Sequence, residues 1–115
     1  MHGAQVLLDA TDFRDSISRS YYAVLDAADA ALIAKGFTPR SHEGSISLFS
    51  RHFVKNGSVD QKFGGLFNRM KKARERADYE REVVFEKEDA EYWLDIAKEF
   101  VSTIENLLPK LLEEK

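Results

Sequence analysis

Several residue types that often decide a protein's chemistry are rare or missing in this sequence of 115 residues. It contains no cysteine, which excludes disulfide bonds, thiol catalysis and thiolate metal sites. No apolar run approaches the roughly 18 residues of a membrane-spanning helix, and no charged leader precedes the first apolar turn, so we expect a cytoplasmic protein without a membrane partner. Acidic residues outnumber basic ones by 20 to 17, so nucleic acid could bind only at a local basic patch.

What is present indicates one folded domain over residues 1–115. With 43% hydrophobic and 32% charged residues, the chain is too apolar for disorder, and its length leaves no room for two independent cores. Neither an alternating strand pattern of useful length nor an internal repeat occurs. The sequence therefore predicts an all-α protein.

Apolar residues recur at steps of three and four in three long segments and one short segment, as on the buried face of a helix. The connections between these segments are short, which favours an up-down antiparallel bundle of four to five helices. A short apolar turn precedes them, with Thr11-Asp12 as the cap of the first long helix, and residues 82–86 form the last connection. We expect helices over residues 12–35, 41–55 and 59–81, and from about residue 87 onwards.

Local signals mark where these helices begin, end and bend. Gly36 is expected to end the first long helix in the left-handed conformation, and Thr38-Pro39 to begin the next turn. Ser58 and Gln61 have the spacing of a capping box for the third long helix. Pro109 lies inside the last helix, where it predicts a kink or a new terminal turn, because proline removes a backbone hydrogen bond.

The third long segment carries two ionisable residues on its apolar face. The stripe that contains Phe67 and Met70 continues onto Arg74 and Asp78, which lie four residues apart and can pair. An isolated buried ion costs several kcal/mol, so such a pair needs a reason to be there. It is either a structural ion pair that fixes helix register or part of a functional site, where paired and partly buried ionisable groups cluster.

Three short motifs follow one another in the chain. Residues 18–23 read Ser-Arg-Ser-Tyr-Tyr-Ala, residues 41–57 contain Ser-His-Glu-Gly, Leu-Phe and Phe-Val-Lys-Asn-Gly, and residues 74–79 read Arg-Glu-Arg-Ala-Asp-Tyr. They resemble the Ser-Arg-x-Tyr-Tyr-Ala, His-x-Gly, Leu-Phe, Phe-Val-Lys-x-Gly and Arg-x-x-Ala-Asp-Tyr segments of the HEPN domains (higher eukaryotes and prokaryotes nucleotide-binding). The resemblance is to the small stand-alone prokaryotic branch of that family.

This resemblance implies a helical bundle that forms a homodimer and is encoded beside a minimal nucleotidyltransferase in a toxin-antitoxin arrangement. Many family members are metal-independent ribonucleases that use an arginine followed a few residues later by a histidine. Here none of the three histidines, His2, His42 and His52, follows an arginine at that spacing, and Asp26 stands where relatives often have histidine. An endoribonuclease with a variant Arg/Asp/Tyr site therefore remains one alternative, and a purely structural dimerisation module is another.

The candidate site that these considerations favour is formed by Arg74, Asp78 and Tyr79. Arg74 could hold the phosphate of a nucleotide or RNA, Asp78 could orient it or act as a base, and Tyr79 offers a hydroxyl or a stacking face. In some relatives a tyrosine near the signature receives adenylate from the nucleotidyltransferase, which makes Tyr79 a candidate acceptor. Secondary candidates are Arg19, Tyr22, His42 and Arg76.

Six basic residues within thirteen positions form the only local basic patch. They could contact RNA phosphates, or they could be a solvated helix face. No metal or other cofactor is expected, since the Glu-x-x-His pattern of helical-bundle metal sites is absent around His42 and His52. The patch consists of Arg69, Lys71, Lys72, Arg74, Arg76 and Arg81.

Overall fold

The computed structural model describes residues 13–80 and 85–113. The predictions for the apolar turn before the first long helix, for its cap and for most of the 82–86 connection lie outside these residues. Within them the chain forms four α-helices and one π-helical turn, with no strand, so the all-α prediction is confirmed. The elements are α2 (Phe13–Ala34), α3 (His42–Phe49), η1 (Ser50–Val54), α4 (Lys62–Tyr79) and α5 (Lys87–Glu113).

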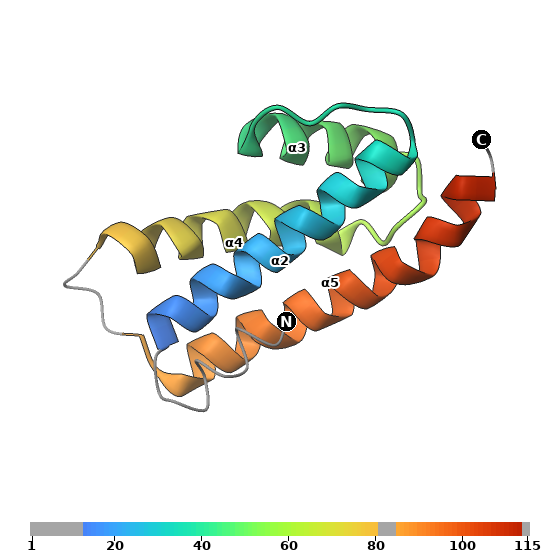
Figure 1. The fold of residues 1–115 in the computed structure, drawn as a ribbon. Coiled ribbons are helices and arrows are strands. Elements are labelled where there is room, and N and C mark those ends of the chain that lie inside the picture. Colours follow the sequence, from blue (N-terminus) through green and yellow to red (C-terminus); the bar gives the residue numbers. More distant parts are fainter. Residues whose placement is uncertain (1–12, 81–84, 114–115) are drawn as a thin grey trace.

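The helices form an elongated bundle of 46 × 23 × 22 Å around α2 (Figure 1). α4 lies against α2 and runs in the opposite direction (Figure 1). The start of α2 therefore meets the end of α4, where Arg14 donates a hydrogen bond to the carbonyl oxygen of Ala77 at 2.9 Å. α5 follows α4 and again runs along α2 (Figure 1). These three helices alternate in direction along the chain, as an up-down bundle requires.

The short helix α3 instead runs in the same direction as α2. Near its start Ser45 donates a hydrogen bond to Asp29 at 2.6 Å, and beyond its end the carbonyl oxygen of His52 accepts one from Lys35 at 3.0 Å. The connection after α2 carries the chain back along the bundle before α3 begins (Figure 1). It turns at Gly36, whose φ of 99° is the left-handed conformation expected there.

The caps of α3 and α4 differ from the sequence prediction. Ser41, not Thr38, caps α3 by accepting a hydrogen bond from the Gly44 amide at 2.9 Å. The capping box expected of Ser58 and Gln61 does not form, because α4 begins only at Lys62, which puts Gln61 at the N-cap position, where it makes no side-chain cap. Instead the Asp60 carboxylate accepts from the Lys62 amide at 2.9 Å.

Two further helix predictions are refined by the structure. The expected helix over 41–55 ends in the π-helical turn η1, in which the Lys55 amide bonds to the Ser50 carbonyl oxygen at 2.9 Å. This turn buries Phe53 and leaves Arg51 and Lys55 exposed. α5 continues through Pro109 to its end, so no separate terminal turn forms.

Aromatic rings from α3, η1, α4 and α5 fill the core in one half of the bundle. The Phe49 ring lies 5.0 Å from Phe53 and 5.3 Å from Phe100, and Phe63 lies 5.2 Å from Phe100, measured between ring centroids. Each buried ring contributes roughly 1.5–3 kcal/mol relative to exposure. This packing holds α4 against α5 and the α3-η1 segment and so helps to determine where its polar end lies. In the part of the chain that the structure describes, no helix is long and apolar enough to cross a membrane.

Candidate functional site

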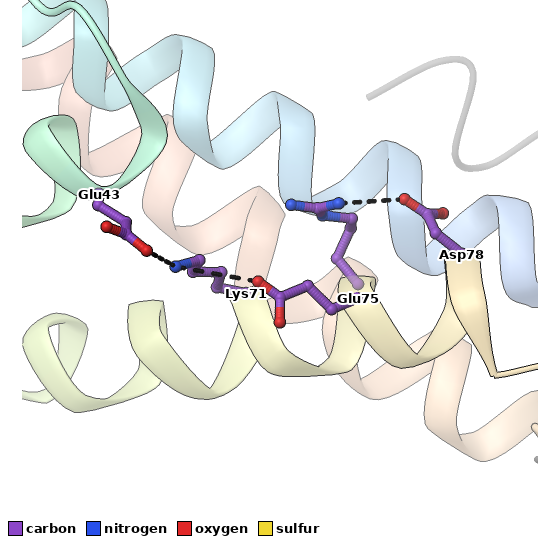
Figure 2. Close-up of polar contacts among 5 residues, drawn as sticks. Glu43, Lys71, Glu75 and Asp78 are labelled. Atoms are coloured by element: carbon purple, nitrogen blue, oxygen red, sulfur yellow. Dashed lines mark hydrogen bonds and ion pairs between the residues drawn. The ribbon is translucent and has the colours of Figure 1, made fainter.

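The polar interruption of the α4 core stripe is an ion pair with a buried cation. Arg74 is only 7% exposed, and its Nη1 lies 3.3 Å from Oδ2 of Asp78, as the four-residue spacing predicts. The Asp78 side chain is 27% exposed, so the pair reaches the surface through its carboxylate. Figure 2 shows the Asp78 carboxylate directed along α4 toward this contact.

The Arg74 guanidinium lies over two tyrosine rings of α2. Its Cζ atom is 5.0 Å from the centroid of Tyr21 and 5.6 Å from that of Tyr22, within the range of a cation-π interaction. Tyr21 is fully buried, whereas Tyr22 is 39% exposed. Tyr21 therefore anchors α2 in the core, and Tyr22 forms a wall of the site that solvent can reach.

His42 joins this group from a third helix. It is the first residue of α3, and its ring centroid lies 6.0 Å from those of both Tyr21 and Tyr22. Three helices that are distant in the sequence thus place an imidazole, two phenols, a guanidinium and a carboxylate side by side. We refer to Tyr21, Tyr22, His42, Arg74 and Asp78 as the Arg74 cluster.

The Arg74 cluster contains buried hydrogen-bond donors without acceptors. Neither the Tyr21 hydroxyl nor the Nε atom of Arg74 has a hydrogen-bond partner of good geometry among the described residues, although the Arg74 guanidinium lies close enough to the hydroxyl to lower its pKa. Burial raises the pKa of Tyr21, and the nearby Arg74 charge offsets only part of that shift, so the hydroxyl keeps its proton. Burial lowers the pKa of Arg74, but the hydrogen bond to Asp78 and the neighbouring tyrosines more than reverse this, so the guanidinium stays charged.

Three other predicted site residues lie outside this group. Tyr79 is 75% exposed, and neither its side chain nor that of exposed Arg19 makes an ion pair or ring contact with described residues. Arg76 pairs at the surface with Glu80, at 3.3 Å between Nε and Oε2. The structure therefore joins Arg74 and Asp78 to Tyr22 and His42, and leaves the other candidates on the surface. Residues 13–80 and 85–113 hold no group of three His, Asp or Glu side chains that could bind a metal ion.

A polar groove of about 340 Å³ lies beside the Arg74 cluster, between α4 and the α3-η1 segment. Lys71 crosses its edge: Nζ lies 3.3 Å from Oε1 of Glu43 and 3.9 Å from Oε1 of Glu75, as Figure 2 shows. Sequence reasoning missed this groove, because Arg51 and Lys55 lie in a different segment from Lys71. Its polar lining includes Ser47, Ser50, Arg51, Lys55, Asn68 and Lys71.

The basic residues of α4 do not form one patch. Lys71 and Arg74 face the groove and the Arg74 cluster, whereas Arg69, Lys72 and Arg76 line a separate hollow of about 290 Å³ that also contains Trp93 of α5. Arg81 lies outside the described residues. The expected patch is therefore divided over two sides of the helix, because residues three or four apart share a face and adjacent residues do not.

Comparison with known proteins decides the family. A family model described as the HEPN domain matches residues 1–107. The chain belongs to the HEPN domain family. This confirms the resemblance inferred from the three motifs, and it places the Arg74 cluster within a HEPN bundle.

This HEPN chain is similar to proteins from bacteria and archaea over most of its length. A UPF0332 protein of Thermotoga maritima is 36% identical over 94% of this chain and 82% of its own length. A protein of Methanocaldococcus jannaschii named "Putative toxin" is 31% identical over 97% of this chain and 83% of its own length. A second protein of that organism with the same form of name is 32% identical over 73% of this chain and 58% of its own length. No solved structure matches the chain with statistical significance.

Proposed function

We propose that this HEPN protein is the helical partner of a minimal nucleotidyltransferase in a toxin-antitoxin-like pair, and that it binds a nucleotide or RNA phosphate at the Arg74 cluster. The observation that carries the proposal is the buried guanidinium of Arg74: within residues 13–80 and 85–113, neither its Nε nor the neighbouring Tyr21 hydroxyl has a hydrogen-bond partner of good geometry. Buried donors in folded proteins nearly always have acceptors. A phosphate would supply oxygens to both groups.

The chemistry of Arg74 suits a phosphate in particular. A guanidinium offers five N–H donors in a planar fork and binds phosphate oxygens in pairs, and Asp78 takes up only one of its nitrogens. Asp78 then holds the fork in place, which is an orienting role. Tyr22 offers a half-exposed ring on which a base could stack. These features favour a ligand that combines phosphate and base.

The partner and the assembly rest on the family. Two of the relatives carry the name "Putative toxin", and the resemblance implies a nucleotidyltransferase partner and a homodimer. Tyr79 is 75% exposed at the end of α4, so its hydroxyl would be accessible to a partner that transfers adenylate. Adenylation of Tyr79 is therefore part of the proposal.

A pull-down from the native cells tests this proposal. The protein and its Arg74→Ala variant are recovered, their fold is checked by circular dichroism, and the protein and nucleic acid that accompany each are identified. We expect a nucleotidyltransferase with the native protein, and nucleic acid that is lost with the folded variant. Recovery of neither, or of the same nucleic acid regardless of Arg74, would refute the binding role and favour a structural ion pair in a dimerisation module.

His42 favours a second candidate function, an endoribonuclease. Its ring centroid lies 6.0 Å from that of Tyr22, and the Arg74 Cζ lies 5.6 Å from the same Tyr22 centroid, so an imidazole that can transfer protons and a guanidinium that can bind phosphate lie against one ring. In such a reaction the RNA 2′-oxygen loses its proton and bonds to phosphorus, while the 5′-oxygen leaves and gains a proton. Imidazole transfers such protons, and arginine stabilises the charge.

The second candidate predicts cleavage of RNA in the presence of a metal chelator, with a 2′,3′-cyclic phosphate as product. His42→Ala and Arg74→Ala should both abolish it, whereas DNA of the same sequence should stay intact because it lacks the 2′-hydroxyl. If the RNA stays intact after prolonged incubation with the native protein, the endoribonuclease function is refuted and only the binding function remains.

A further inference from the structure

The groove beside the Arg74 cluster is shaped by the π-helical turn η1. A π-helical turn inserts a residue into the helical hydrogen-bond pattern. Such turns are rare in proteins overall, and those that occur are often found at functional sites. Here the turn buries Phe53 and Val54 while directing Arg51 and Lys55 to the groove. The local backbone thus departs from the α-helix where it sets two cations beside α4.

The positive charge of this groove exceeds the negative charge that the described residues place beside it. Arg51, Lys55 and Lys71 face a single lining carboxylate, that of Glu43. Within the described part of the chain Arg51 and Lys55 form no ion pair, and Lys71 alone is neutralised by Glu43 and Glu75. An anionic ligand would therefore meet two unpaired cations and a third that can exchange partners.

The remaining lining distinguishes a phosphodiester from a protein surface. Ser47, Ser50 and Asn68 add hydrogen-bonding side chains, and Ile46 is the only apolar residue in the lining. Lysine, arginine, serine and asparagine are the side chains that contact phosphate and sugar in nucleic-acid complexes. A protein partner would need an apolar centre in its interface, which this groove lacks.

The groove and the Arg74 cluster lie next to each other along two helices. On α4, Lys71 precedes Arg74 by three residues, or about 4.5 Å of helix axis. On α3, Glu43 of the groove directly follows His42 of the cluster. Two places that suit an anion thus adjoin, and a ligand that occupies both must carry more than one phosphate.

From this arrangement we propose that the groove binds the phosphodiester backbone of a single-stranded polynucleotide, one further phosphate of which reaches Arg74. The inference rests on the proposed function of the Arg74 cluster and names its ligand as a polynucleotide rather than a mononucleotide. Glu43 forms an ion pair with Lys71 in the free protein, and this ion pair breaks when Lys71 binds the incoming phosphate. The half-exposed ring of Tyr22 stacks with a base at the Arg74 end.

Fluorescence anisotropy with a labelled uridine oligonucleotide tests the proposal, using the full chain in native form and as Arg51→Ala/Lys55→Ala. Each phosphate contact to a single strand contributes about 0.7 to the slope of log affinity against log salt. Loss of two contacts should lower the slope by about 1.4. When salt is raised from about 50 to 200 mM, the factor by which affinity falls should therefore be about sevenfold smaller for the variant than for the native protein.

A charge-matched control is Lys87→Ala/Lys110→Ala, which removes two exposed lysines from α5, outside the groove. It should retain the native salt slope. An unchanged slope in the Arg51→Ala/Lys55→Ala variant, or an equal loss in the control, would overturn the assignment of the groove. The deoxyuridine oligonucleotide serves as a second probe, and binding of either strand through the groove supports the proposal.

Failure of this inference is distinguishable from failure of the proposed function. If Arg74→Ala weakens binding and the groove variant does not, the Arg74 cluster binds phosphate and the groove assignment is refuted. If a labelled mononucleotide binds as tightly as the oligonucleotide, the polynucleotide assignment is likewise refuted. A further outcome is that the Arg51→Ala/Lys55→Ala variant binds the oligonucleotide as the native protein does and fails to recover an acidic protein that the native protein recovers in the pull-down. That result would assign the groove to the acidic protein and overturn the proposal.

Discussion

Replacement of Tyr21 by phenylalanine separates the stability of the Arg74 cluster from its function. The Tyr21 hydroxyl is fully buried, and no described residue forms a hydrogen bond of good geometry with it; a buried group without such a partner costs roughly 1–3 kcal/mol. Phenylalanine removes the hydroxyl but keeps the ring, together with its packing and its contact with Arg74. We expect Tyr21→Phe to raise the free energy of unfolding by about 1 kcal/mol while weakening the binding of a phosphate ligand.

The pH dependence of stability gives an independent test of the same hydroxyl. Burial raises the pKa of Tyr21 in the folded protein above the value of about 10 in an unfolded chain. The folded state therefore holds this proton at a pH where the unfolded state has lost it. The free energy of unfolding is therefore independent of this group below about pH 10, and it falls as pH rises from there through the folded pKa. Tyr21→Phe should lose less stability than the native protein over that interval.

The assay is urea unfolding followed by circular dichroism, at neutral pH and at several values above pH 9. Tyr92→Phe is the matched control, because its side chain is exposed and its hydroxyl is not buried. It should leave the neutral-pH stability within about 0.5 kcal/mol of native. If Tyr21→Phe is less stable than the native protein by 1 kcal/mol or more, the hydroxyl has a stabilising partner. Its burial would then no longer support a phosphate site at the Arg74 cluster.

Other substitutions probe the ion pair, the groove and the backbone. Arg74→Ala should lower the free energy of unfolding by about 2–3 kcal/mol, since it leaves a cavity and an unpaired Asp78, whereas Arg74→Met, of similar volume, should be within about 1 kcal/mol of native or more stable in urea unfolding. Glu43→Gln should raise the affinity for the oligonucleotide severalfold in anisotropy, because it frees Lys71 from a competing carboxylate; an unchanged affinity would contradict that competition. Gly36→Ala should destabilise by about 1 kcal/mol because of its positive φ, whereas Gly65→Ala, inside α4 with open space around it, should stabilise by about 0.5–1 kcal/mol; both are read from thermal unfolding, and equal effects would contradict the backbone argument.

Sequence reasoning succeeded where the interactions are local. The apolar periodicity of α2, α4 and α5 located these helices, because a helix face depends only on residues three and four apart. The contact between Arg74 and Asp78 followed from the same spacing. The HEPN resemblance then named the correct family.

The features that sequence reasoning missed depend on contacts between segments or on small energy differences. His42 meets Tyr22 only because α3 runs parallel to α2, and the length of a connection does not determine that direction. The η1 turn differs from an α-helical turn by one residue of hydrogen-bond spacing, and Phe53 would be apolar in either register. The groove combines Arg51 with Lys71, which no local pattern joins.

The balance of energies within the Arg74 cluster distinguishes a ligand site from a structural ion pair. A pair selected only for stability would leave no buried donor unsatisfied, since apolar side chains of the same volume are often at least as stabilising. Among the described residues, the Arg74 Nε and the Tyr21 hydroxyl both lack acceptors, so we expect phenylalanine and methionine at these positions to make the cluster more stable. A bound phosphate would recover that energy and stabilise the fold, by about 2.7 kcal/mol at one hundred times its dissociation constant. The double variant Tyr21→Phe/Arg74→Met should then be at least as stable as the free native protein and gain nothing from the oligonucleotide. Equal stabilisation of both proteins by the oligonucleotide would place the ligand elsewhere.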